Sequence, residues 1–478
     1  MSTEYLDLSQ GVERRVFVKG LGYVSMGVIL TLFGGCEKFC ESIKHRPMRR
    51  RLRTGSAEVD SAIATYKNAV TLMKGLPSSD PRSWSAQAAL HGTVAGGFNF
   101  CQHGTDHFFS WHRAYLLYFE RICQQLTGDK SFGLPYWNWN QDPAMHPEFT
   151  APGSPLAHPR SATTVAGNSA FSTPTLDTIF GDGNFFSFGS QLEGSPHNIA
   201  HVLVGMDMLT GGSPLDPIFW AHHCMVDYCW AKWNIELDND NTNDPGWINT
   251  SWGHFVDGQG NPVNVTAGLT TIMPLLSYQY ESSAIGSAAA GAALSAAALE
   301  KIEKRVRAGI DVHLEIKKRV VIAERTSLSL ARPFSKETLV SAQDFSALIE
   351  GDRTKERVFA SISYVQAPVT NDFFIRVFVN LPTASASTPT DDPHYAGSFA
   401  FFGAQTGHGA GHHHKTDFLV NVTDTLQRLR GGGELAADRP ISMQLVAVPA
   451  TGEFVKPDTE LVLEKVELIV SPVLIRQR

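Results

Sequence analysis

The chain has 478 residues, of which 43% are hydrophobic and 18% charged, enough for a full core and more than one domain. Its formal net charge of −7 is not that of a nucleic-acid-binding protein, which usually carries a basic surface. Six cysteines do not make a disulfide framework in a chain of this length. The arginines at positions 49–51 and 53 form a local run, which we expect to be solvated or paired with an acidic surface.

The amino-terminal segment, residues 1–55, has the pattern of an export signal. Arg14 and Arg15 precede an apolar stretch at residues 20–35, which is typical of a twin-arginine signal. At about 15 residues the stretch is too short for a stable membrane span. We therefore expect export to the periplasm or the exterior. Two alternatives stay open: a lipobox-like site at Cys36, or retention of the stretch as a buried helix in a cytoplasmic protein.

Helical patterns begin after this segment and contain a first set of histidines. Residues 57–74 read as a helix, and residues 84–90 lead into His91. His103 follows, and apolar residues at helical spacing then continue beyond His112. We expect His112 near the start of an amphipathic helix opened by Ser110.

A second set of histidines follows a loop-rich insert at residues 140–192, which is crowded with Gly, Pro, Ser and Thr. His197 and His201 are four residues apart after a Ser-Pro pair that suits a helix start, so both rings leave one helix face. His223 completes this set, whereas neighbours on a helix, such as His222, point about 100° away.

Two sets of three imidazoles are what a pair of coupled copper ions requires. Neutral imidazole suits copper in both oxidation states, and a site without carboxylates keeps little negative charge around Cu(I). This composition favours redox chemistry with dioxygen over hydrolysis. One such histidine alone would more often be a core or surface residue, so the spacing of all six carries the interpretation.

The same residues resemble the two copper signatures of the tyrosinase and polyphenol oxidase family of type-3 copper proteins. The first signature, with its Phe-Phe-x-Trp-His-Arg core, runs from His103 to Glu120, and the second, Asp-Pro-x-Phe-x3-His-x3-Asp, from Asp216 to Asp227. The spacing of the second excludes His222. By this resemblance one copper, CuA, is bound by His91, His103 and His112, and the other, CuB, by His197, His201 and His223.

The resemblance implies oxidation of small phenols with dioxygen as co-substrate: monophenols are ortho-hydroxylated and o-diphenols become o-quinones. Glu193 and Asn198 match family positions thought to hold a water that acts as base. Cys101 has the Cys-x-His spacing at which some members of the family form a thioether to the histidine, here His103; a free buried cysteine is the alternative. At residues 210–213, Thr-Gly-Gly-Ser, small side chains either leave room for substituted phenols or form a flexible turn.

Three other functions stay open: a catechol oxidase, an o-aminophenol oxidase without monophenolase activity, and a dioxygen carrier of the hemocyanin type. We expect a bacterial member with small-molecule phenols as partners, no nucleic acid and no stable membrane span. The sequence is compatible with a homo-oligomer.

The carboxy-terminal part has a different pattern. Residues 276–280 resemble the tyrosine motif that closes the catalytic domain in this family, which implies a copper domain spanning 56–281. An Ala/Gly/Ser-rich linker follows at 282–305. In residues 306–478, period-two segments at 357–365, 373–381, 441–448 and 461–470 predict a β-sandwich. The expected fold class is a mainly α catalytic domain, a four-helix bundle around a dicopper centre, followed by this sandwich.

The resemblance further implies that the carboxy-terminal domain covers the copper site until activation. The aromatic candidates for filling the phenol pocket are Phe399, Phe401 and Phe402, although in a β-rich domain each is more often a core residue. A nearby loop contains His408 and the run His412, His413 and His414, which we interpret as solvated, with copper capture as the alternative.

Overall fold

The computed structural model describes residues 46–95, 97–242, 244–271, 273–287, 316–353, 355–364, 368, 370–402, 418–437 and 439–472. The twin-arginine segment with Cys36, most of the expected linker, and the histidines at 408 and 412–414 lie outside these residues. Among the described helices, none combines the length and apolar character needed to cross a membrane.

The described chain divides into two compact units that do not follow its linear order. The helical unit comprises residues 46–91, 107–158 and 214–287. The sheet unit comprises residues 92–106, 159–213 and the described part of 316–472. Part of the histidine-bearing region therefore belongs to the same compact unit as the carboxy-terminal strands.

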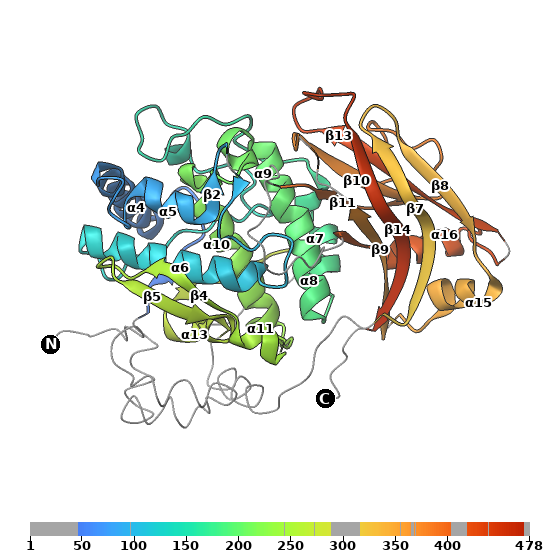
Figure 1. The fold of residues 1–478 in the computed structure, drawn as a ribbon, viewed down its shortest axis with the longest axis horizontal. Helices are drawn as coiled ribbons and strands as arrows, with labels where there is room; N and C mark the ends of the chain where they lie inside the picture. Colours follow the sequence, from blue (N-terminus) through green and yellow to red (C-terminus); the bar gives the residue numbers. More distant parts are fainter. Residues whose placement is uncertain are drawn as a thin grey trace. The chain divides into compact units, whose positions relative to one another are not determined.

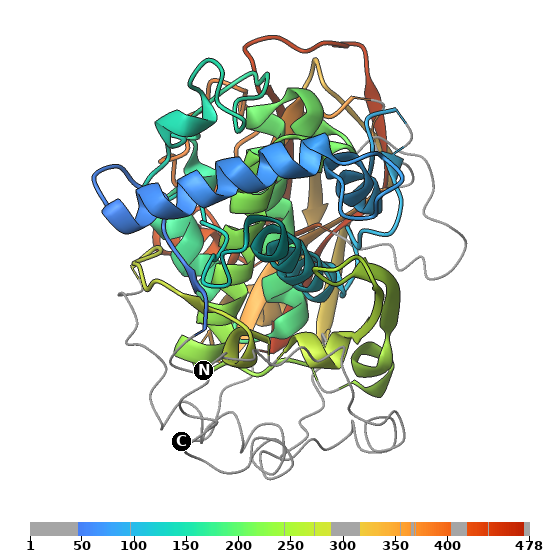
Figure 2. The same cartoon turned by 90° about the vertical axis from the view of Figure 1, so that its left-hand side faces the viewer.

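The helical unit is built around the twenty-residue helix α6 (Phe108–Thr127), which packs against α4 (Ala57–Gly75) and α10 (Ile218–Ala231). Figure 2 shows α4 lying across α6. The expected helix at 57–74 is confirmed, and the Ser56 hydroxyl caps it by accepting a hydrogen bond from the Val59 amide. The expected role of Ser110 is wrong, because α6 begins two residues earlier and Ser110 lies inside it.

Shorter elements complete the helical unit. They include α5 (Trp84–His91), α11 (Pro245–Asn249), α12 (Ala267–Thr270), α13 (Met273–Leu276), the parallel strands β1 (Met48–Arg49) and β6 (Gln279–Tyr280), and the antiparallel strands β4 (Ser251–Val256) and β5 (Pro262–Thr266).

The sheet unit contains two four-stranded antiparallel sheets, visible in Figure 1, with orders β11-β10-β13-β8 and β12-β9-β14-β7. One apolar core receives side chains from both sheets, as expected for a sandwich. The strands are β7 (Lys318–Ser329), β8 (Phe334–Leu339), β9 (Glu356–Tyr364), β10 (Phe373–Val379), β11 (Tyr395–Ala400), β12 (Phe418–Asn421), β13 (Pro440–Pro449) and β14 (Glu460–Pro472).

The four strands expected from period-two patterns correspond to β9, β10, β13 and β14, so the fold class of a helical part followed by antiparallel sheets is confirmed. The other four strands were not anticipated. The insert expected to be loop-rich also contains two helices, α7 (Thr173–Phe180) and α8 (Phe185–Leu192). Asn184 caps α8 by accepting hydrogen bonds from two backbone amides. The Gly and Ser residues around it led to the prediction of a loop.

Within the sheet unit, α8 leads through a kinked segment, η3 (Glu193–His197), in which Ser195 has an extended backbone, into α9 (Asn198–Val204). Strand β12 contacts α8, and β11 contacts both η3 and α9. The edge strands β11 and β12, one from each sheet, therefore lie next to the segment that bears Glu193, His197, Asn198 and His201.

Candidate metal centre

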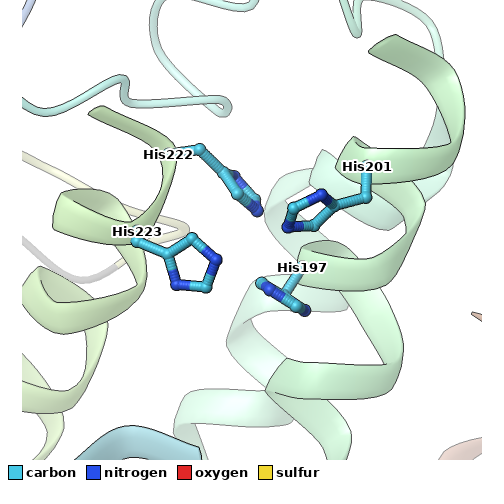
Figure 3. Close-up of side chains that lie close together, drawn as sticks. All are labelled: His197, His201, His222 and His223. Atoms are coloured by element: carbon cyan, nitrogen blue, oxygen red, sulfur yellow. The ribbon is translucent and has the colours of Figure 1, made fainter. Parts of the chain in front are cut away.

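Seven buried histidines form two groups that could each hold a metal ion: His91, His103 and His112, and His197, His201, His222 and His223. Figure 3 shows the second group, in which His197 and His201 project from adjacent helical turns, and His222 and His223 are consecutive residues of α10. The described residues thus contain the two histidine sets expected of a dinuclear copper centre.

In the helical unit, His91, His112 and His223 come from the ends or interiors of α5, α6 and α10. The rings of His112 and His223 are stacked with centroids 4.3 Å apart. Phe219 packs against His91 at 5.0 Å and His223 at 4.2 Å, and Phe108 packs against His112 at 5.0 Å. The phenylalanines of the two signatures therefore restrict the rotation of the histidine rings.

Hydrogen bonds define which nitrogen several of these histidines can offer to a metal. The Nδ1 of His112 lies 2.8 Å from the Phe108 carbonyl oxygen, and that of His201 lies 2.7 Å from the Met208 carbonyl oxygen. Because a carbonyl oxygen only accepts, each Nδ1 carries the hydrogen and each Nε2 keeps the lone pair that a copper ion needs.

His197 is oriented in the same way by its neighbour. The Asn198 side-chain nitrogen donates to the carbonyl oxygen of Ala400 at 2.7 Å, so the amide oxygen faces the Nδ1 of His197, 2.8 Å away. That oxygen only accepts, and therefore the His197 Nδ1 donates and its Nε2 is the metal-facing atom.

His222 has the opposite arrangement. The Trp139 indole nitrogen donates to the Nδ1 of His222 at 3.0 Å. An indole N–H cannot accept, so a neutral His222 carries its hydrogen on Nε2, which then has no lone pair for a metal. Although His222 lies in the second group, this hydrogen bond favours His223 as the ligand from α10.

Glu193 is buried at the start of η3, beside His103. Its Oε1 accepts a hydrogen bond from the Gly104 amide at 2.7 Å and lies 3.2 Å from the His103 Nδ1. Burial raises the pKa of Glu193 to about 8, the Gly104 hydrogen bond opposes this rise, and the charge of Asp106 adds to it. The carboxyl group is thus placed to orient His103, and its burial disfavours the charged form.

Cys101 is fully buried and forms no disulfide. Burial, reinforced by the charge of Glu193, raises the pKa of its thiol well above the usual range. Cys101 is therefore held as a thiol next to the His103 segment, and its thioether to His103 stays a prediction.

An aromatic side chain from the sheets covers the histidines of the sheet unit. The Phe402 ring lies 3.8 Å from the His201 ring between centroids, and it makes edge contacts with His103 at 4.8 Å and His197 at 5.7 Å. The other two aromatic candidates, Phe399 and Phe401, are buried in the sandwich core. Strand β11 ends at Ala400, and Phe402 lies beyond this end.

Strands β11 and β12 fit closely against η3 at Gly194. A Cβ atom placed at Gly194 would lie 3.3 Å from Phe418 and 3.6 Å from Phe399. The absence of a side chain at Gly194, next to Glu193, therefore allows β11 and β12 to approach η3 closely.

Close packing at the Gly-Gly pair at 211–212 contradicts its reading as a flexible turn, whereas its role in leaving room for substituted phenols stays a prediction. A Cβ atom at Gly211 would lie 2.1 Å from the Gly97 carbonyl oxygen, and one at Gly212 would lie 2.6 Å from a Val94 methyl carbon. The two glycines let the hairpin β2 (Gly92–Thr93) and β3 (Gly97–Phe98) pack onto their loop.

The expectation that the arginine run is at the surface is wrong for Arg49. Its guanidinium group is completely buried, and it bonds Glu120 at 2.9 Å and Asp227 at 3.0 Å. Tyr278 and Tyr280 each donate a hydroxyl hydrogen bond to Asp227 at 2.6 Å. The tyrosine motif and the acidic ends of both signatures thus share one buried ionic network, whose arginine the local sequence concealed.

Comparisons with known proteins agree with this geometry. A family model described as the common central domain of tyrosinase matches residues 81–178 and 157–236, and one described as the carboxy-terminal domain of chloroplastic polyphenol oxidase matches residues 340–460. The chain is 30% identical to a tyrosinase of Hahella sp. (strain CCB-MM4) over 46% of this chain and 61% of that protein.

A latent polyphenol oxidase of Prunus armeniaca is 25% identical over 83% of this chain and 73% of its own length. The structure of a latent aurone synthase, a polyphenol oxidase, covers 90% of both chains with a TM-score of 0.62 and 21% identity, which supports the fold. The chain spans less than half the length of several plant relatives, between 44% and 49%.

Proposed function

The chain belongs to the tyrosinase and polyphenol oxidase family, and on that premise we propose that it oxidises phenols with copper and dioxygen. It ortho-hydroxylates monophenols and oxidises o-diphenols to o-quinones. Bound copper supplies the activation of dioxygen in this chemistry. The proposed ligands are His91, His103 and His112 for CuA, and His197, His201 and His223 for CuB.

The packing of Phe402 carries the proposal for the substrate class. A six-membered aromatic ring lies against His201, His103 and His197, so the space over these histidines has the dimensions and apolar character of a phenol ring. We infer that a phenol takes this position when Phe402 leaves it.

Glu193 and Asn198 are the proposed groups that handle the phenol proton. A phenol has a pKa near 10, far above neutral pH, so it needs a base. Each of the two side chains bonds the Nδ1 of a proposed ligand, His103 for Glu193 and His197 for Asn198. A water held by these two side chains would be adjacent to the phenol position and could accept its proton.

We also propose that the sheets shield the centre, with Phe402 as the residue that fills the phenol position. Bacterial origin and twin-arginine export stay predictions. An exported protein would leave the cell latent and become active after Phe402 is displaced.

The decisive experiment measures quinone formation by the copper-loaded full chain from tyramine and from catechol, with and without mild detergent. We expect oxidation of both substrates, increased by detergent. Glu193→Gln should reduce tyramine hydroxylation by about 10²–10⁴-fold, the usual cost of removing a positioned base, and catechol oxidation by much less. The surface variant Glu148→Gln, on a half-exposed carboxylate, is the control.

Each other outcome identifies a different function. Oxidation of catechol alone would indicate a catechol oxidase, and turnover of o-aminophenol without tyramine an o-aminophenol oxidase. Reversible dioxygen binding without turnover of any phenol would indicate a carrier of the hemocyanin type. Equal losses on tyramine and catechol in Glu193→Gln would mean that Glu193 is only structural.

A further inference from the structure

The hairpin formed by β2 and β3 holds one aromatic side chain, Phe98, close to the proposed phenol position. A Cβ atom at Gly92 would lie 2.2 Å from the Gly97 carbonyl oxygen, and the same oxygen closely approaches Gly211. The backbone immediately before Phe98 is therefore fixed on two sides by glycine contacts that tolerate no side chain. Such packing restricts where the Phe98 ring can go.

Phe98 contacts both a proposed copper ligand and the ring that covers the ligands. Its ring stacks on His103 with centroids 4.9 Å apart and planes inclined by 28°. It also lies 5.4 Å from the Phe402 ring at an inclination of 54°. Both distances are within the range in which aromatic pairs attract each other.

Among the described residues of the sheet unit, the Phe402 ring contacts four aromatic side chains, three of which are histidines proposed to bind copper. The fourth, Phe98, is not a candidate metal ligand. A phenol ring that replaced Phe402 would meet the same Phe98 face or edge. Among these neighbours, Phe98 can be changed without removing an imidazole.

We propose that Phe98 is a specificity-determining residue that forms the aromatic wall of the phenol position and selects flat, unsaturated rings. This inference rests on the proposed function, because it places the substrate ring where Phe402 lies. Phe98 contributes to binding because an aromatic ring attracts another aromatic ring more strongly than it attracts a saturated ring of similar size.

The test compares two ligands that differ in ring planarity, benzoate and cyclohexanecarboxylate. Their dissociation constants are measured by titration calorimetry on the copper-loaded full chain carrying Phe402→Ala, which vacates the ring position. Adding Phe98→Leu keeps an apolar side chain but removes the aromatic face. Benzoate should then bind about two- to tenfold more weakly, the range of one aromatic contact, with a smaller change for cyclohexanecarboxylate.

Two further variants separate specificity from a structural role. Phe98→Tyr keeps the ring and should bind benzoate within about twofold of the parent, a change smaller than one aromatic contact. Phe100→Leu, two residues along the chain and 48% exposed, should change neither ligand. All variants should retain the copper content of the parent.

The proposal is overturned if Phe98→Leu weakens both ligands equally, leaves benzoate unchanged, or loses copper, since copper loss would mean that Phe98 only supports His103. If Phe98→Leu misfolds, Phe98→Tyr provides the test. Loss of the preference for benzoate over cyclohexanecarboxylate in Phe98→Tyr would also overturn the proposal. Calorimetry needs no turnover, so failure to oxidise catechol would contradict the proposed function without deciding the role of Phe98.

Discussion

The side-chain amide of Asn198 donates a hydrogen bond of 2.7 Å to the carbonyl oxygen of Ala400, the last residue of β11. Two residues later, Phe402 packs on His201. One short segment thus engages both a proposed proton-handling residue and the proposed phenol position. Because the acceptor is a backbone carbonyl, substitution of the Ala400 side chain leaves this bond available.

Removal of the Phe402 ring is expected to relieve latency. Full burial of a Phe side chain contributes roughly 1.5–3 kcal/mol, and Phe402 is partly buried, so Phe402→Ala should raise the kcat/KM of the full chain for a bulky catechol by up to about 10- to 100-fold. Copper content should stay unchanged. The assay is quinone formation without detergent, together with metal analysis.

The matched control is Phe399→Ala, which removes a ring from the sandwich core. It should lower the free energy of unfolding by about 3–5 kcal/mol, the usual cost of truncating a buried Phe. An activity gain in Phe399→Ala as large as that in Phe402→Ala would show that loosening of the sheets, and not the ring itself, governs latency.

The two adjacent histidines of α10 should differ in copper binding. His222 accepts a hydrogen bond from Trp139, which places the imidazole hydrogen on Nε2. We expect His223→Ala to retain about one copper ion per chain and His222→Ala to retain two, since a metal ion needs a nitrogen lone pair. Copper is measured by atomic absorption after dialysis. The reverse result would exchange the two assignments.

The close contact at Gly211 should make this position intolerant of a side chain. A Cβ atom there would approach the Gly97 carbonyl oxygen to 2.1 Å, so Gly211→Ala should lower the free energy of unfolding by about 1–3 kcal/mol, the typical cost of overpacking. Urea unfolding measures the change. Gly75→Ala is the control, because a Cβ atom at Gly75 meets no atom within 4 Å. Equal stability of the two variants would contradict the packing role.

The buried network at Asp227 should make stability depend on pH. Burial raises the pKa of Asp227, but the guanidinium groups of Arg113 and Arg49 and the two tyrosine hydroxyls outweigh burial, so its pKa lies below the usual value. The ionised carboxylate therefore stabilises the fold above the unfolded pKa near 3.9, and this stabilisation is lost as pH falls through the folded pKa.

We therefore expect Asp227→Asn to lower the free energy of unfolding at pH 7 by about 3–5 kcal/mol, since it leaves buried arginine charge uncompensated. The difference from the parent should shrink below about pH 4, where the parent carboxylate also becomes protonated. Urea unfolding of copper-free protein avoids a contribution from acid release of copper. Asp60→Asn, at an exposed position of α4, is the control, and a difference independent of pH would argue against the ionic role.

Local sequence patterns were sufficient for much of this protein. Spacing of three or four residues places His197 and His201 on one helix face, and their rings indeed lie 4.7 Å apart. Period-two alternation similarly identified β9, β10, β13 and β14. These features depend on residues close in the chain, so periodicity alone reveals them. Strand β12 is too short, and the start of α8 too rich in Gly and Ser, for a hydrophobic period to be recognised in the sequence.

Contacts between distant residues were decided only by the tertiary structure. Arg49 belongs to a run that reads as surface charge, yet it is buried because Glu120 and Asp227 converge on it. Gly211 reads as a free turn, yet the hairpin at Gly97 fills the space beside it. Among three phenylalanines of one segment, strand pairing directs Phe399 into the core and leaves Phe402 beyond the end of β11, against the histidines. The burial of a side chain and the residues that it contacts depend on segments distant in the chain, so the local hydrophobic pattern does not predict them.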